Sequence, residues 1–196
     1  MVVESRRDVA KLRERFGDAI LSVQDKRGDA YVCVERDRLA RVAQFLRDDT
    51  ELAYDYYVEC LGVDYLTWEH TRDLEGRFEV VHNLYSTKHD SRLFLKVGVG
   101  DGQTVPTLMT VWSGAEYPER ETWDLFGIVF HGNEQTQRFL LPDDWVGHPL
   151  RKDVGLGGED VDFDLGTKGP AVEDVQTPHA GESFEGKAGS EDISGR

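Results

Sequence analysis

The sequence predicts an α+β fold in which N-terminal helices pack on a mainly antiparallel sheet, followed by short helices, a strand-and-loop segment and an extended C-terminal tail. Three observations predict this fold. Two N-terminal segments carry apolar residues at helical spacing, and three later segments alternate apolar with polar residues, as half-buried strands do. The links between those strands are too short for the crossover helices that parallel neighbours require, so antiparallel pairing is expected.

The first helix is expected to begin at Ser5, a helix-capping residue, and to end at Gly17. Short strands are expected at 20–23 and 31–34, on either side of a polar turn at 25–29. The apolar face of this helix comprises Val9, Leu12 and Phe16.

A second helix is expected after Asp37, its predicted N-cap. The run of strands then covers 54–61, 78–85 and 93–99, with turn residues between them. The buried face of the second helix comprises Leu39, Val42, Phe45 and Leu46.

After the strands, the pattern predicts a helical stretch from residue 104 to 112 and a second short helix from 115 to 126. Pro118 suits the first turn of that second helix, and Gly127 suits its C-terminal stop. A short strand at 128–130 follows, and then a polar loop and a turn-rich segment.

The composition changes near residue 154. Residues 154–196 contain ten acidic and three basic residues, nine glycines and few large apolar side chains. Such a segment buries too little apolar area to offset the entropy lost on ordering. We therefore expect an α+β domain at 1–153 and an acidic, extended or disordered tail at 154–196, which orders along a partner through Phe163 and Phe184.

Charge and hydropathy exclude several classes of protein. The chain has 23 basic and 38 acidic residues, so its net charge is −15, opposite in sign to that of a free-standing nucleic-acid binder. No apolar run approaches the roughly 18–20 residues that span a bilayer, and the N-terminus lacks an apolar stretch of signal-peptide length. We expect a protein of a reducing compartment that is not integral to a membrane.

Two candidate cofactor sites do not meet the spacing that their chemistry needs. Cys33 and Cys60 lie in strand-like segments and form no CxxC pair, so they are interpreted as buried free thiols. The glycine-rich stretch at 98–102 follows a strand, but Gln103 breaks the dinucleotide-binding spacing. We interpret it as a turn that ends the strand.

The acidic segment at 119–127 is more informative. On a helix, Arg120 and Asp124 are i,i+4 neighbours, and an ion pair between them is expected. Trp123 and Phe126 share a helix face with Glu119. Paired carboxylates are compatible with catalysis, but the sequence shows no pocket. A charged network packed against another surface is the structural interpretation.

The segment at 147–153 has a similar character. Pro149 restricts the preceding His148 to an extended conformation. Arg151 is suited to bidentate contact with a partner's carboxylate, or to local pairing with a nearby aspartate. The aspartates near enough for such pairing, or for a metal site with His148, are Asp143, Asp144 and Asp153.

These two segments together resemble the C subunit of the bacterial type I NADH–quinone oxidoreductase, respiratory complex I. The family core Glu-Arg-Glu-x-x-Asp-Leu-Phe-Gly-Ile is matched at 119–128, and Pro-x-x-Trp-x-Gly-His-Pro-Leu-Arg-Lys-Asp is matched at 142–153. The resemblance covers roughly residues 5–155. It assigns signature and subunit-interface positions to Glu119, Arg120, Glu121, Asp124, Phe126, Gly127, Pro142, Trp145, Gly147, His148, Pro149, Arg151, Lys152 and Asp153.

The resemblance implies a scaffolding and assembly subunit in the peripheral arm of a proton-translocating complex, on the cytoplasmic side of the cell (inner) membrane. It implies partners among the hydrophilic-arm subunits of complex I, especially the B and D subunits of the quinone site. It also implies that FMN and the iron–sulfur clusters are held by partner subunits, with no catalytic, cofactor-binding or metal residue in this chain. Electrons would pass from NADH to ubiquinone or menaquinone through those partners.

Three alternatives remain open. The loop at 132–138 and the residues after Asp153 depart from the family pattern, which leaves room for a related membrane-bound hydrogenase or another donor–quinone oxidoreductase. A stand-alone hydrolase would use Glu119, Glu121 and His148 in a concave pocket. A free-standing regulatory binder would use the acidic tail.

Overall fold

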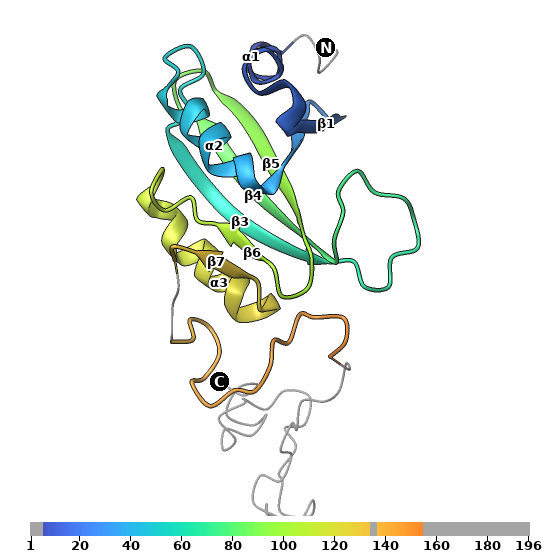
Figure 1. Ribbon diagram of the computed structural model, residues 1–196. Coiled ribbons are helices and arrows are strands. Elements are labelled where there is room, and N and C mark those ends of the chain that lie inside the picture. The colour runs from blue at the N-terminus through green and yellow to red at the C-terminus, as the bar shows by residue number, and fades with distance from the viewer. Residues whose placement is uncertain (1–5, 134–136, 155–196) are drawn as a thin grey trace, which may run out of the picture. The chain divides into compact units, whose positions relative to one another are not determined.

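A computed structural model describes residues 6–133 and 137–154 of the chain (Figure 1). In this part the fold is α+β, as predicted. The helices and strands are α1 (Arg7–Phe16), β1 (Ile20–Lys26), β2 (Asp29–Val34), α2 (Leu39–Asp48), β3 (Tyr56–Asp64), β4 (Phe78–Ser86), β5 (Ser91–Val99), β6 (Thr104–Pro106), α3 (Glu116–Phe126) and β7 (Val129–His131), with single 3₁₀ turns at Gly17–Ala19, Arg36–Arg38 and Ser113–Ala115.

The main sheet has the strand order β1-β2-β5-β4-β3. Three of its four neighbouring pairs are antiparallel, as predicted, and the fourth pair, β2 with β5, is parallel. The short links in the sequence join consecutive strands, whereas β2 and β5 are separated by α2, β3 and β4. The length of the links between consecutive strands carries no information about pairing between strands that are distant in the sequence.

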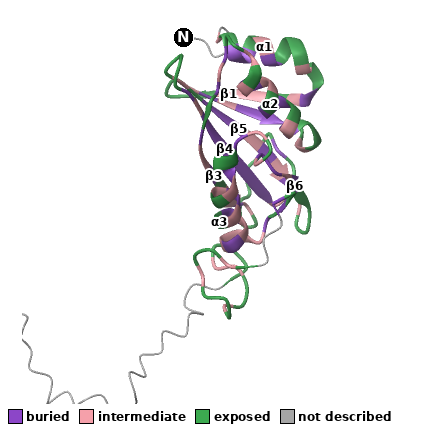
Figure 2. Ribbon diagram, turned by 90° about the vertical axis from the view of Figure 1, so that its left-hand side faces the viewer, coloured by how far each residue is buried: buried purple, intermediate pink, exposed green. Residues whose placement is uncertain are grey.

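One face of the sheet forms the core with α1 and α2, which lie on the same side of it (Figures 1 and 2). The apolar residues expected on these helices are buried there, including Leu12, Leu39 and Leu46 at 0% exposure. Figure 2 shows buried residues along the central strands and mostly exposed or intermediate residues after β7. Both cysteines are free and buried, as predicted.

The opposite face is crossed by the long loop between β3 and β4. The loop starts at one edge of the sheet, and its Asp73 accepts hydrogen bonds from Ser22 and Gln24 on β1 at the other edge (2.7 and 2.6 Å). Gly98 on β5 makes this crossing possible, because a Cβ there would lie 2.1 Å from the carbonyl oxygen of Glu75. The glycine-rich stretch is thus a packing feature followed by a turn.

The helix predicted from 104 to 112 is wrong. Residues 104–106 form β6, which pairs in parallel with β7, and 107–112 form turns. The apolar spacing that resembled a helix arises because the turns direct both Leu108 and Trp112 into the core. The later helix and strand are confirmed as α3 and β7, with Gly127 as the left-handed C-cap of α3 (φ 76°).

Two predicted caps have different outcomes. Asp37 is not the N-cap of α2, because it lies inside the 3₁₀ turn that precedes the helix, and the cap residue Arg38 makes no side-chain capping bond. Ser5 lies outside the described residues, as do Phe163, Phe184 and the rest of 155–196. None of the described helices is long and apolar enough to cross a bilayer.

Candidate functional site

Asp124, in the last turn of α3, organises the start of the segment 137–154. Its side chain is fully buried. One carboxylate oxygen accepts the backbone N–H groups of Phe139, Leu140 and Leu141 at 3.1, 2.8 and 3.0 Å. The other accepts Nη1 of Arg138 at 2.9 Å. A single carboxylate therefore fixes four consecutive residues against the helix.

The electrostatics of this site favour a charged Asp124. Burial acts to raise the pKa of its carboxyl group, but the hydrogen bonds from Leu141, Arg138, Leu140 and Phe139 outweigh burial and lower the pKa below its ordinary value. The carboxylate therefore stays ionised at neutral pH and keeps all four donors satisfied.

Arg138 extends the same network along the segment. Its Nη2 donates to the carbonyl oxygens of Trp145 and Gly147 at 3.0 and 2.9 Å. The ion pair predicted between Arg120 and Asp124 is wrong: Arg120 donates to the carbonyl oxygens of Gln137 and Arg138 instead. Helical spacing indicates which side chains are neighbours, but Asp124 points inward, toward a cation from outside the helix.

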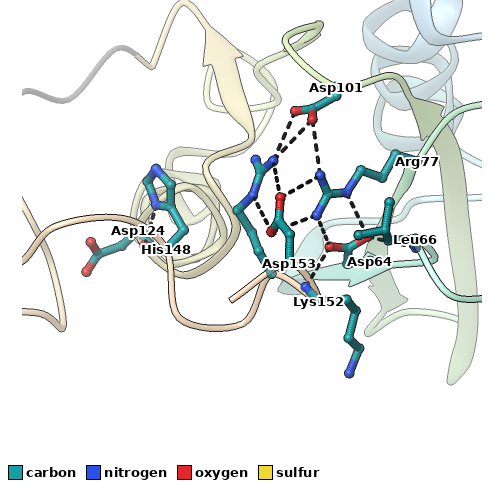
Figure 3. Close-up of polar contacts among 9 residues, drawn as sticks. Asp64, Leu66, Arg77, Asp101, Asp124, His148, Lys152 and Asp153 are labelled. Carbon is teal, nitrogen blue, oxygen red and sulfur yellow. Dashed lines mark hydrogen bonds and ion pairs between the residues drawn. The ribbon is translucent and has the colours of Figure 1, made fainter. Parts of the chain in front are cut away.

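His148 and Gly127 bring the second signature segment onto the end of α3. The His148 ring nitrogen Nδ1 lies 2.8 Å from the carbonyl oxygen of Asp124. Figure 3 shows the two residues side by side. The backbone N–H of Leu150 donates to the carbonyl oxygen of Leu125 at 3.1 Å. A Cβ at Gly127 would lie 2.6 Å from Cδ2 of His148, so only glycine leaves room for the ring.

A second carboxylate, Asp64 at the end of β3, holds the end of the segment (Figure 3). Arg77 donates to both oxygens of Asp64 at 3.0 and 2.6 Å. The Arg77 guanidinium also contacts Asp101 and Asp153 at 3.1 and 2.9 Å. Arg151 contacts the same two carboxylates at 3.1 and 3.2 Å. Local pairing of Arg151, one of the two predicted alternatives, is therefore what the chain forms.

Asp64 also accepts two backbone N–H groups, from Leu66 at 3.0 Å and from Lys152 at 2.9 Å. Burial acts to raise the pKa of its carboxyl group, but Arg77 and these two amides lower it overall. The pKa of Asp153 is also lowered, by hydrogen bonds from Arg77 and then Arg151. At neutral pH the cluster is a set of charged groups that join β3, the turn after β5 and the segment 137–154.

Glu119 has a different, internal role. Its side chain is fully buried, and it accepts hydrogen bonds from Oγ1 of Thr107 (2.6 Å), the backbone N–H of Leu108 (2.7 Å) and Nδ2 of Asn133 (2.9 Å). Burial raises the pKa of Glu119 despite these bonds. The carboxyl group fastens the turns after β6 and β7 to α3, whereas Glu121 on the same helix is exposed.

The remaining predicted positions lie around these contacts. Phe126 packs over Gly62 of β3, where a Cβ would lie 2.7 Å from its ring. Trp145 is half-buried, whereas Pro142 and Gly147 are exposed. Neither Glu119 nor Asp124 is exposed, so any neighbour meets the segments that they hold rather than the carboxylates themselves.

The geometry does not assemble the hydrolase trio. Glu119, Glu121 and His148 share no hydrogen bond in the described part of the chain. A cavity of about 790 Å³ lies elsewhere and is lined by Arg6, Tyr54 and other residues. Within 6–133 and 137–154, no group of three or more His, Cys, Asp or Glu side chains is placed to hold a metal ion.

The sequence reasoning missed Asp64, Arg77 and Asp101 as site residues. Each lies at the end of a strand or in a turn, where charged residues are common. The one signal in the sequence was that Asp64 and Arg77 are charged residues near the ends of two predicted strands. That signal does not identify the partner of either charge.

Comparison with known proteins shows the family of this chain. The family model described as "Respiratory-chain NADH dehydrogenase, 30 Kd subunit" matches residues 32–160. The C subunit of the NADH-quinone oxidoreductase of Roseiflexus sp. (strain RS-1) is 47% identical over 164 residues, which cover 83% of this chain and 91% of that protein. The chain belongs to this family. Its relatives are subunits of an oxidoreductase complex.

Other members and solved structures support the assignment. The corresponding C subunit of Geobacter metallireducens is 42% identical over 80% of this chain and 93% of its own length. The trypsin-resistant fragment of Nqo5 superposes with a TM-score of 0.53 at 29% identity, covering 64% of this chain and 96% of the fragment. A chain of an archaeal membrane-bound sulfane sulfur reductase has a TM-score of 0.63 at 21% identity over 76% of this chain and 85% of its own, which shows a shared fold.

Proposed function

We propose that this chain is a cofactor-free scaffolding and assembly subunit in the peripheral arm of a proton-translocating NADH–quinone oxidoreductase. It supports electron transfer from NADH to quinone through FMN and iron–sulfur clusters that other subunits hold. It contributes no catalytic residue and joins the cytoplasmic side of the membrane only through the complex. Its direct partners are the hydrophilic-arm subunits, especially the B and D subunits of the quinone site.

The observation that carries the proposal is that the charged and the apolar side chains in and around the segment 137–154 have different surroundings. The charges on Asp124, Arg138, Arg151 and Asp153 contact other groups of this chain. The segment that they hold exposes large apolar side chains instead: Phe139 (40%), Leu140 (56%), Val146 (94%) and Leu150 (47%).

Exposed apolar groups on a fixed backbone are what a docking surface requires. Isolated apolar side chains on a surface are ordinary, but several on one segment mark an interaction site. The internal ion pairs restrict the backbone before binding, which reduces the entropy lost on association. The arrangement therefore suits binding to another protein better than it suits chemistry.

The proposal is tested by affinity purification of the tagged full-length chain from native membranes in mild detergent. We expect flavin- and cluster-bearing subunits to co-purify with NADH–quinone reductase activity. Recovery of hydrogenase or other donor-oxidising subunits would keep the scaffolding role and replace the electron donor. Recovery of the chain alone would overturn the proposal.

A further inference from the structure

Asp64 joins two segments that lie far apart in the sequence. Its two oxygens accept the backbone N–H groups of Leu66 and Lys152, at 3.0 and 2.9 Å. Because both amides bind one carboxylate, the loop after β3 and the end of the segment 137–154 lie side by side, as Figure 3 shows. The family signature contains Lys152 but does not reach Leu66.

The side chains beside this junction are large, apolar and exposed. Leu66 is 50% exposed and Trp68 is 55% exposed on the loop. Leu150 is 47% exposed and Val154 is 43% exposed on the segment. These apolar side chains come from the two segments that the buried Asp64 joins, and they differ from Phe139 and Leu140 at the start of the segment 137–154.

The loop is held in shape by its own contacts. The N–H of Tyr65 donates to the carbonyl oxygen of Arg77, and the N–H of Trp68 donates to that of Tyr65, both at 2.9 Å. The Trp68 ring packs edge-on against His70, with ring centres 4.9 Å apart. The Arg72 guanidinium lies 4.1 Å from the centre of the Tyr65 ring. Trp68 is therefore presented by an ordered turn.

Lys152 adds one charge to this surface. The cations around it bind carboxylates of this chain: Arg77 binds Asp64 and Arg151 binds Asp153. The Lys152 side chain instead points away from the cluster and is exposed (Figure 3). In the described part of the chain it contacts no carboxylate, so the surface is complementary to an apolar segment that carries an acidic group.

We propose that Leu66, Trp68, Leu150 and Lys152 form a second docking surface, which binds an apolar segment of a neighbouring subunit with a carboxylate opposite Lys152. This inference rests on the proposed function, because it needs the chain to be part of a complex. Asp64 is the positioning residue that keeps the two halves of the surface in register.

The first test changes the charge in the complete complex, purified through a tag on this chain. We expect Lys152→Glu to reduce the recovered neighbouring subunits by about five- to tenfold, because like charges at an interface repel. Lys152→Arg should keep them. Lys88→Glu is the matched control, since Lys88 is an exposed lysine at the opposite end of β4.

The second test removes the aromatic anchor and identifies the acidic partner. Trp68→Ala should lower recovery by a similar factor, whereas Tyr56→Ala, which truncates a side chain that is 56% exposed on β3, should not. Zero-length carbodiimide cross-linking of the wild-type complex should join the Lys152 amine to a carboxylate of a neighbouring subunit. That product should be absent in Lys152→Arg.

The outcomes separate the two proposals. If wild type recovers no complex subunits, the proposed function fails. If wild type recovers them and Lys152→Glu and Trp68→Ala recover as many, the docking surface is refuted while the function stands. If only Trp68→Ala fails to recover them, the surface is apolar and the carboxylate opposite Lys152 is refuted.

Discussion

Arg138 and Asp124 form an ion pair of 2.9 Å in which the arginine side chain is 14% exposed and the carboxylate is fully buried. The carboxylate comes from α3 and the cation from the segment that follows β7. A buried pair stabilises a protein only when its remaining hydrogen-bonding groups are satisfied. Here they are, by three backbone amides on Asp124 and two carbonyl oxygens on Arg138.

Replacing the carboxylate at this site should weaken the fold. We expect Asp124→Asn to lower the free energy of unfolding by about 2–4 kcal/mol, because it leaves the Arg138 charge buried and replaces one acceptor oxygen with a donor. Chemical denaturation measures the change. Glu121→Gln on the exposed face of the same helix is the control, with an expected change within about 0.5 kcal/mol. Equal effects would show that the pair contributes nothing specific.

Buried His82 should make the fold sensitive to acid. Burial lowers the pKa of His82 from 6.5 to about 3, and its ring nitrogen Nδ1 lies 2.8 Å from the Tyr57 hydroxyl. The unfolded chain therefore binds a proton more tightly than the folded chain, so stability falls as the pH drops below 6.5.

The size of that effect follows from one proton. We expect the free energy of unfolding to fall by about 1.4 kcal/mol per pH unit below 6.5 through this group. His82→Gln keeps an acceptor for Tyr57 and removes the titration. Denaturation of both proteins at pH 6.5 and pH 5 separates the contribution of His82 to the free energy of unfolding from that of Glu119. The pKa of Glu119 is raised, so its contribution changes with pH in the opposite direction. Parallel losses in the two proteins would contradict the assignment.

The packing of the long loop across the sheet should depend on residue 98 being a glycine. In Gly98→Ala the new Cβ would lie 2.1 Å from the carbonyl oxygen of Glu75, a backbone atom that moves only with the loop. We expect a loss of about 1–3 kcal/mol, as for other overpacked sites. Gly114→Ala is the control because no heavy atom lies within 4 Å of its new Cβ. A thermal unfolding experiment that gives equal midpoints for the two variants would refute the packing role.

The contact between Gly127 and His148 can be separated from backbone strain. Gly127 and Gly147 both have positive φ, at 76° and 87°, so alanine at either costs about 1–2 kcal/mol. Only at Gly127 does the new Cβ also meet His148. We expect Gly127→Ala to destabilise more than Gly147→Ala, and to speed amide exchange at Leu150. Similar exchange rates at Leu150 in both variants would contradict this.

Local patterns in the sequence predicted the elements, and long-range contacts decided the rest. The helix that became α3 and its stop at Gly127 were predictable because capping and spacing are local signals. Residues 104–112 were not, because Leu108 is buried by packing that a turn achieves as well as a helix does. At the site, the signature located Asp124 and Asp153. The partners Arg138 and Asp64 follow only from the folded arrangement.

Amide hydrogen exchange on the isolated full-length chain tests most directly whether the signature charges act inside the chain. If they do, the amides of Leu140, Leu141 and Lys152 are protected before any partner binds. Asp124→Asn should remove protection at Leu140 and Leu141 and leave Lys152, which binds Asp64, unchanged. Exchange at the rate of an unstructured peptide in the isolated wild-type chain would contradict this, because the signature charges would then order the segment only within the complex.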